Sequence, residues 1–283
     1  MVNFTTKSFK PVLLCCCMVL GMACAKKTNQ GIAGAGTAST DTSSALKVLT
    51  YNIHHANPPS RPDSIDLKAI ARVITQEQPD LVALQEVDVY TVRSGKGIHQ
   101  ADELARLTGM KAYFAKAIDY GGGEYGVAVL SKLPMEAMKN NPLPTAAGTN
   151  GERRTLGSVI ITLPNGNKIR FAFTHLDAQS SSVNRLLQIR EIASILQTEK
   201  LPVIIAGDFN AVPGTEVINI LDSSFTRTCV TGCGFTIPVV NPNKTIDFIA
   251  FKPRNLFTVV DHQVIDEKYA SDHLPVKAVL KLQ

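Results

Sequence analysis

A chain of 283 residues has room for one large domain or two small ones, and its hydrophobic fraction of 45% excludes a mostly disordered protein. The formal net charge is +5 at pH 7, and subtracting Lys7 and Lys10, which lie in a segment we expect to be removed, leaves +3. A charge this small does not by itself indicate binding to nucleic acid or to a membrane.

The N-terminus, residues 1–25, has the features of an export signal. Lys7 and Lys10 precede an apolar stretch of about fifteen residues, 11–25 (PVLLCCCMVLGMACA), which is shorter than the roughly 20 residues that a helix needs to span a bilayer. Two processing routes fit: the A-C-A sequence around Cys24 resembles a signal peptidase site, and Cys24 itself resembles a bacterial lipoprotein cysteine. The lipoprotein is favoured because a polar tether follows directly. We therefore expect an exported protein, either a periplasmic, outer-membrane or cell-surface lipoprotein with a membrane tether through Cys24, or a secreted protein.

The remainder of the chain divides into a linker and one domain. Residues 26–45 are rich in Gly, Ala, Ser and Thr without apolar periodicity, which indicates a flexible linker. No internal repeat or second low-complexity segment follows, so residues 46–283 are predicted to form one catalytic domain.

Its two cysteines, Cys229 and Cys233, fit a small-loop disulfide or two free thiols equally well, whereas a zinc site would need two further ligands nearby.

Short apolar runs alternate with amphipathic segments in this domain. The predicted helices are 64–78, capped by Asp63 or Ser64 and ended by Pro79, then 100–108 before Gly109, and 183–197. The predicted strands are 46–53, 81–86, 127–131, 156–163, 169–174, 203–206, 246–251 and 275–281. Strands and helices mixed in this order predict an α/β fold whose sheets are buried on both faces.

Side chains of metal-binding or acid–base type recur at the ends of these predicted strands. Burying a lone carboxylate costs on the order of several kcal/mol unless it is paired or bound to a metal. One such residue is best explained as a capped turn or a satisfied core group, but a whole set at strand ends is not, because open α/β sheets place their ligands there. The segments are TYN at 50–52, QE at 85–86, THLD at 174–177, GDFN at 207–210, IDF at 246–248 and SDH at 271–273.

These residue types suit hydrolysis at phosphorus. Carboxylate and amide oxygens are the ligands that a hard ion such as Mg²⁺ prefers, and histidine serves as an acid or base near neutral pH. The sequence has no Gly-rich loop ending in Lys-Ser/Thr, which excludes a P-loop nucleotide enzyme at the level of motifs. It also lacks Gly-x-Ser-x-Gly, which disfavours an esterase of the α/β-hydrolase type.

In chain order, TYNIHH, ALQEVD, EYGVAVLSK, THLD, GDFN, IDFI and SDHLPV resemble the successive motifs of the endonuclease/exonuclease/phosphatase superfamily. That superfamily includes pancreatic-type deoxyribonucleases, abasic-site endonucleases, neutral sphingomyelinases and inositol-polyphosphate 5-phosphatases. Each motif alone is weak, but seven in order over residues 50–276 are specific. The resemblance implies a four-layer α/β sandwich, in which two mixed β-sheets pack face to face with helices on both outer faces. One departure is Val127, which stands where many relatives have Asn.

The resemblance also implies a metal site for Mg²⁺ or Mn²⁺. Glu86 matches the principal metal ligand of the superfamily. Asn52 matches the amide beside that ligand, which contacts the metal or its water. Asp272 matches a further acidic ligand.

The same resemblance implies the catalytic residues. Asp208 and Asn210 match the pair that orients the attacking water and holds the phosphate oxygens. His273 matches the catalytic histidine, which the carboxylate matching Asp247 holds in place. His175 matches the second histidine of the nuclease and sphingomyelinase branches, where it stabilises the transition state or helps the leaving group. Whether Asp208 or His273 takes the proton of the water stays open at this point, although the pairing with Asp247 favours His273.

Six other polar residues lie close to these motifs. Arg185 and Gln188 follow THLD on a predicted helix and are expected to pack or to bond to a loop. Arg153 and Arg154 follow Glu152 in a predicted loop. The sequence is equally compatible with two roles for them: binding a substrate phosphate with both side chains, or lying as a solvated pair on the surface. The candidates for substrate contact are His54, His55, Arg153 and Arg154.

The predicted function is a metal-dependent phosphoric ester hydrolase that acts by in-line water attack. The preferred substrate is a phosphodiester of a phospholipid head group or another small phosphoester, which suits an exported protein of weak charge. The first alternative is an exported nuclease, but the sequence shows no Lys/Arg cluster interleaved with aromatic residues and contains no Trp. The second alternative is a non-catalytic binding protein on the same fold. No protein partner is predicted.

Overall fold

Strands and helices follow one another along the whole domain. The computed structural model describes residues 45–283, so the predictions for the export signal and nearly all of the linker lie outside the described residues. The strands are β1 (Ala45–Asn52), β2 (Leu81–Val89), β3 (Lys111–Tyr120), β4 (Gly123–Ser131), β5 (Met135–Pro142), β6 (Thr155–Thr162), β7 (Lys168–His175), β8 (Val203–Asp208), β9 (Thr226–Arg227), β10 (Asp247–Lys252), β11 (Phe257–Val264) and β12 (Val276–Leu282). The helices are α1 (Leu67–Glu77), α2 (Gln100–Thr108), α3 (Val183–Gln197) and α4 (Glu216–Ser224), with short 3₁₀ turns at His54–Ala56 and Arg254–Leu256.

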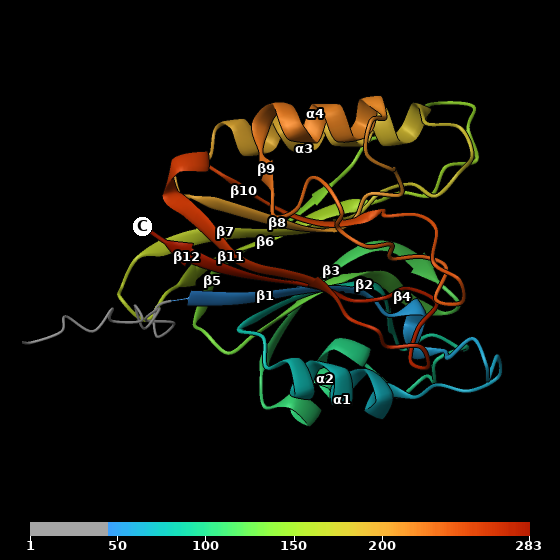
Figure 1. Ribbon diagram of the computed structural model, residues 1–283. Helices are drawn as coiled ribbons and strands as arrows, with labels where there is room; N and C mark the ends of the chain where they lie inside the picture. Colours follow the sequence, from blue (N-terminus) through green and yellow to red (C-terminus); the bar gives the residue numbers. More distant parts are fainter. Residues whose placement is uncertain (1–44) are drawn as a thin grey trace, which may run out of the picture. The chain divides into compact units, whose positions relative to one another are not determined.

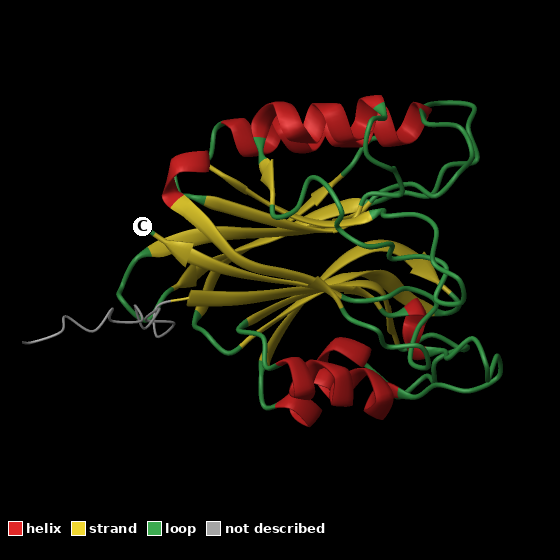
Figure 2. Ribbon diagram, in the orientation of Figure 1, coloured by secondary structure: helices red, strands yellow, loops and turns green. Residues whose placement is uncertain are grey.

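Two six-stranded sheets face each other at the centre of the domain (Figure 1). The first has the order β11-β12-β1-β2-β4-β3 and the second has the order β5-β6-β7-β8-β10-β9. Both sheets are mixed, because β1 pairs with β2 and β7 with β8 in parallel while their other neighbours are antiparallel. Helices α1 and α2 cover the outer face of the first sheet, and α3 and α4 cover that of the second (Figure 2). The predicted four-layer α/β sandwich is confirmed.

Apolar side chains fill all three interfaces between these layers. Between the sheets lie fully buried side chains such as Val48, Phe171 and Phe173. The α1–α2 layer packs on the first sheet through residues such as Ile70, and the α3–α4 layer packs on the second through residues such as Ile192. The central strands are therefore buried on both faces, as expected for sheets covered on both sides.

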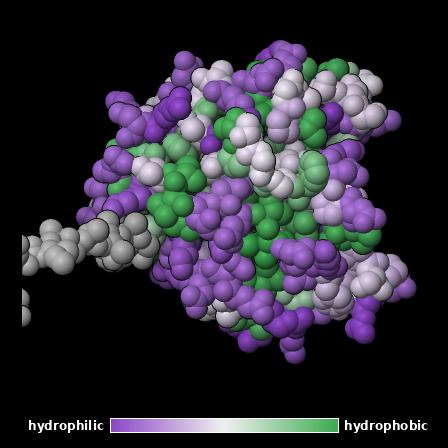
Figure 3. Space-filling view, in the orientation of Figure 1, coloured by the Kyte–Doolittle hydropathy of each residue, from purple (hydrophilic) through white to green (hydrophobic). Residues whose placement is uncertain are grey.

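The face of the domain seen in Figure 3 is largely hydrophilic, with apolar residues gathered along its middle. Among the helices of residues 45–283, none is long and apolar enough to cross a membrane.

The predicted helix boundaries are correct for α2 and α3, but the start of α1 is wrong. The helix begins at Leu67 and not at Ser64, because the Asp66 side chain accepts a hydrogen bond from the Ala69 N–H at 2.9 Å and so caps it. It ends before Gln78, which has φ 50° and precedes Pro79. The four edge strands β3, β5, β9 and β11 and helix α4 were not predicted, since their apolar runs are short or interrupted.

Candidate active site

The strand ends that carry the predicted site residues meet at one edge of the two sheets. Asn52 ends β1 opposite Gln85 of its parallel neighbour β2, and His175 ends β7 opposite Asp208 of β8. Strand β10 runs antiparallel to β8, so its first residue, Asp247, pairs with Asp208. His273 precedes β12, whose first residues pair with the end of β1. The topology thus brings together residues that are more than 200 positions apart in the sequence.

A β-bulge presents Glu86 at this edge. The register between β2 and β4 shifts between Leu84 and Val87, and Glu86 has a left-handed backbone with φ 58°. Such a bulge changes the direction in which a strand residue points, which explains why Gln85 is fully buried while the Glu86 side chain is 22% exposed. Burial raises the pKa of a carboxyl group, but the neighbouring His55 and the hydrogen bond from Asn52 outweigh that effect and hold the pKa of Glu86 well below its usual range. The carboxylate is therefore ionised at neutral pH.

The amide of Asn52 connects the two sheets. Its Nδ2 atom donates to Glu86 Oε1 and to Asp208 Oδ2, both at 3.1 Å. Its Oδ1 atom accepts from the His54 backbone N–H at 3.1 Å. Asn52 is buried, so these bonds hold the two carboxylates in fixed positions relative to one another.

Asp208, Asp247 and His273 form a buried acid–base group. His273 Nδ1 lies 2.9 Å from Asp247 Oδ2, and its Nε2 lies 3.8 Å from Asp208 Oδ2. Burial opposes the charge on His273, but the carboxylate of Asp247 outweighs it and raises the pKa of His273 to about 10. Burial and the charge of Asp247 also raise the pKa of Asp208. At neutral pH His273 is therefore protonated, while the pKa of Asp208 is raised towards neutrality, which suits Asp208 to proton transfer.

His175 is held as a neutral hydrogen-bond donor. Its Nδ1 atom lies 3.2 Å from Arg154 Nη1, and since a guanidinium can only donate, the ring proton belongs on Nε2. That Nε2 atom lies 3.5 Å from Asp208 Oδ2, which can accept its proton. Asn210 Nδ2 is 3.0 Å from Nε2 but can itself only donate, and it donates to the Leu176 carbonyl at 2.9 Å. Burial, followed by the charge of Arg154, holds the pKa of His175 well below its usual range.

The two arginines of the predicted pair have different surroundings. Arg153 is exposed, whereas Arg154 is only 6% exposed and pairs with Glu152 at 2.8 Å. Of the two alternatives left open, the solvated surface pair is therefore excluded for Arg154, and the phosphate clamp stays a prediction. Tyr125 lies beside it, with its hydroxyl 3.5 Å from Arg154 Nη1. Sequence analysis gave no role to Glu152 and only an open one to the segment around Tyr125, because their proximity to His175 depends on the pairing of distant strands.

Other predicted residues support the site. Gln188 Oε1 accepts from the Asp177 N–H, and Arg185 Nη1 donates to the Asp177 carbonyl, both at 2.9 Å. These bonds to the loop after His175 confirm the packing role expected for both.

Asn210 has φ 48°, and its N–H donates to Asp208 Oδ1 at 2.8 Å. A disulfide joins Cys229 and Cys233, which decides between the alternatives left open above.

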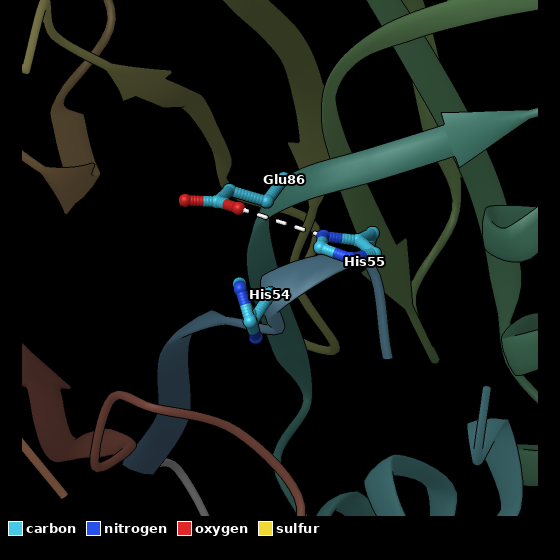
Figure 4. A group of neighbouring side chains, drawn as sticks. All are labelled: His54, His55 and Glu86. Carbon is cyan, nitrogen blue, oxygen red and sulfur yellow. Dashed lines mark ion pairs between the residues drawn. The ribbon is translucent and has the colours of Figure 1, made fainter. Parts of the chain in front are cut away.

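Two groups of His, Asp and Glu among the described residues have ligand atoms within 4.8 Å of one another. One is His54, His55 and Glu86 (Figure 4), and the other is Asp208, Asp247 and His273. Asp272 belongs to neither group and is half-buried, with Ser271 Oγ 3.4 Å from its Oδ1, so its assignment as a ligand stays a prediction. An ionised, solvent-accessible carboxylate held by an amide fits a divalent cation.

Comparisons with known proteins agree with this geometry. The model of the Endonuclease/Exonuclease/phosphatase family matches residues 49–273. A solved endonuclease/exonuclease/phosphatase from Beutenbergia cavernae is 27% identical, with a TM-score of 0.68 over 84% of this chain and 72% of that one. No curated protein matches the sequence.

Two further solved structures share the fold at lower identity. A mannosyl-6-phosphatase of Bacteroides thetaiotaomicron is 19% identical, with a TM-score of 0.68 over 83% of this chain and 99% of that one. The catalytic domain of human nocturnin, with a bound sulfate anion, is 22% identical, with a TM-score of 0.65 over 85% of this chain and 94% of that one.

Proposed function

The chain belongs to the Endonuclease/Exonuclease/phosphatase family, and from that premise we propose that it is a divalent-metal-dependent phosphoesterase. Its substrate is a phosphodiester of a phospholipid head group or another small phosphoester, hydrolysed by in-line attack of water. The observation that carries the proposal is the convergence of the His273–Asp247 pair, Asp208 and His175 beside the ionised carboxylate of Glu86.

Each residue has a task in this proposal. Glu86 would hold the cation, with Asn52 beside it and Asp272 as a further ligand, and the bound cation would neutralise charge on the phosphate oxygens and stabilise the leaving oxygen. Asp208 and Asn210 hold the attacking water and the phosphate.

Asp208 takes the proton of that water, because the raised pKa of His273 leaves its imidazole already protonated at neutral pH. The Asp247 carboxylate at Nδ1 of His273 orients that imidazolium and stabilises its charge beside the phosphate. The Nε2–H of His175 donates to an oxygen of the phosphoryl group, where negative charge develops. Arg154 keeps His175 in that tautomer.

Two observations support a small phosphoester over nucleic acid. The net charge is weak, whereas affinity for a polynucleotide depends mainly on contacts from Lys and Arg to phosphates. A solved structure of the same fold carries the name mannosyl-6-phosphatase, so the fold accommodates a compact phosphoester. Export, which we also propose from residues 1–25, would bring the enzyme to substrates outside the cytoplasm and, through Cys24, to a membrane surface.

The experiment is a substrate panel on the full chain with Mg²⁺, Mn²⁺ or EDTA. The panel contains plasmid DNA, RNA, sphingomyelin, phosphatidylinositol, inositol phosphates and bis(4-nitrophenyl) phosphate. The variant is His273→Ala, and the matched control is His262→Ala, whose imidazole lies on β11 outside both groups of the site.

The proposal expects cleavage of a lipid or a small ester that is lost in EDTA and in His273→Ala and kept in the control. Cleavage of DNA or RNA alone would make the protein a nuclease. No cleavage at all, together with no calorimetric binding of Mg²⁺ or Mn²⁺, would favour the binding protein and contradict the proposal.

A further inference from the structure

The turn that follows β1 places two imidazole rings beside Glu86. His54 and His55 are consecutive, with ring centroids 4.5 Å apart and planes inclined by 62° (Figure 4). His55 Nδ1 lies 3.9 Å from Glu86 Oε2, and one ligand atom from each of the three residues falls within 4.8 Å of the others. The distances match a set of ligands around a space large enough for one cation.

Each ring has a nitrogen that no hydrogen bond to the described residues occupies. His54 Nδ1 lies 2.9 Å from the Asn57 carbonyl, which can only accept, so the proton is on Nδ1 and the lone pair is on Nε2. In metal-binding histidines, a hydrogen bond from the ring nitrogen that does not bind the metal fixes the tautomer and the orientation of the ring. His55 Nδ1 is buried and has no hydrogen-bond partner among the described residues, although it is aimed at Glu86 Oε2 3.9 Å away.

The backbone of this turn is held in an unfavourable conformation. His54, His55 and Ala56 have φ values of 46°, 44° and 59°, which non-glycine residues rarely adopt. The surrounding bonds enforce it: Gln100 Nε2 donates to the His55 carbonyl at 2.7 Å, and Asn57 Nδ2 lies within 3.1 Å of three carbonyl oxygens of the following loop. Backbone strain of this kind persists only where surrounding interactions hold the residues in place, and it is concentrated at functional sites.

The two oxygens of Glu86 face different neighbours. Oε1 accepts from Asn52 Nδ2, which also donates to Asp208 on the side of the acid–base group. Oε2 faces His55. A cation bound between Oε2 and the two imidazoles would therefore use the carboxylate oxygen that Asn52 leaves free.

We propose that His54, His55 and Glu86 form a binding site for a transition-metal dication, such as Mn²⁺ or Zn²⁺, at the Oε2 side of Glu86. Two neutral imidazoles and one carboxylate form a ligand set that suits transition metals and not Mg²⁺, which prefers oxygen ligands. Three protein ligands leave a coordination position open to solvent, as in catalytic zinc sites. Side-chain exposures of 13% for His55 and 22% for Glu86 give a cation access from solvent. The inference rests on the proposed function only in taking Glu86 as a metal ligand.

The test uses Mn²⁺ as a paramagnetic probe of the full chain. Electron spin-echo envelope modulation detects ¹⁴N nuclei of imidazoles bound directly to Mn²⁺, and competition with Mg²⁺ measures the relative affinity of the two ions. The variant is the double substitution His54→Gln and His55→Gln, and the matched control is His262→Gln. Circular dichroism confirms that each variant is folded.

We expect ¹⁴N modulation from Mn²⁺ bound to the unsubstituted protein, with Mn²⁺ displacing Mg²⁺ at least about tenfold more readily than in the double variant. The double variant loses the modulation and the control keeps it. Absence of modulation in the unsubstituted protein, or its persistence in the double variant, overturns the inference. The first of these outcomes does not depend on whether the variant folds.

Hydrolysis is a separate readout. Nitrogen modulation without cleavage of any ester would leave the metal site standing and remove the proposed function. Cleavage without nitrogen modulation would support the proposed function and remove the metal site of His54, His55 and Glu86.

Discussion

The two histidine-containing groups of the site differ in how the chain builds them. Asp208 and Asp247 lie at strand ends in register, and His273, which precedes β12, is hydrogen-bonded to Asp247 and lies 3.8 Å from Asp208. All three are nearly inaccessible to solvent. The group of His54, His55 and Glu86 lies on a left-handed turn and a β-bulge, and it is open to solvent. A buried, connected group fixes where a proton resides, whereas an open group with an unpartnered nitrogen is prepared to receive a ligand.

The largest expected effect separates these two roles. His273→Ala removes the acid–base group and should lower kcat by about a thousandfold, because general acid–base catalysis contributes about 10² to 10⁴. Binding of Mn²⁺ at the other group should be unchanged. Steady-state kinetics and Mn²⁺ titration on one preparation check both. An equal loss of metal binding would show that the two groups are not separate.

A smaller effect is expected where one charged residue acts through another. Arg154→Met removes the donor to His175 Nδ1, so the ring is free to change tautomer and to take up a proton, since the charge that helped to lower its pKa is gone. We expect kcat to fall by about 10- to 100-fold, with the acid limb of the pH–rate profile moved to higher pH. A uniform loss of rate with an unchanged profile would contradict the positioning role of Arg154.

A third prediction concerns the strand contact that places His175 beside Asp208. A Cβ atom added at Gly207 would lie 2.1 Å from the Thr174 carbonyl oxygen of the neighbouring strand, so β7 and β8 must separate to admit it. Gly207→Ala should therefore reduce the free energy of unfolding by about 1 to 3 kcal/mol. Urea denaturation measures this change. Gly97→Ala, where an added Cβ meets nothing within 4 Å, is the control and should be neutral.

The smallest expected effect is on how stability depends on pH. His262 should make the protein less stable as the pH falls, and His273 should make it less stable as the pH rises. Burial lowers the pKa of His262 despite the charge of Asp261, so protonation below about pH 6.5 favours the unfolded chain and stability falls as the pH falls. His262→Gln should remove that loss in melting curves between pH 7 and pH 5. At His273 the pKa is raised to about 10, so its stabilising contribution is full below pH 6.5 and is lost as the pH rises towards 10. Melting curves that follow the same direction at both histidines would be inconsistent with this account.

Sequence reasoning predicted the central strands and helices because both carry strong signals. Strand β8 is buried on both faces and begins with a continuous apolar run, β1 is mostly apolar and buried, and α2 and α3 end at recognisable positions. The edge strand β3 and the exposed strand β5 were missed, because no apolar pattern is required of a strand in contact with solvent. The cap at Asp66 was misplaced since several acceptors precede the helix.

The site was predictable to the extent that its residues end strands. The convergence of Asn52, Glu86, Asp208 and His273 follows from the motif order, and the hydrogen bonds agree with it. The burial of Arg154 beside His175 was not predictable, because it depends on the pairing of β6 with β7 and on the packing of Tyr125. The left-handed turn of His54 and His55 was equally hidden, since neither residue is a glycine that would signal it.

Hydrolysis in ¹⁸O-labelled water under single-turnover conditions tests the central claim most directly. The substrate is the ester that the panel identifies, and mass spectrometry measures the label in the phosphoryl product of the first turnover. Attack by water predicts one ¹⁸O in that product for the unsubstituted protein, with no product in EDTA or from His273→Ala over the same time. An unlabelled phosphoryl product, or labelled product formed at the full rate by His273→Ala, would contradict the account.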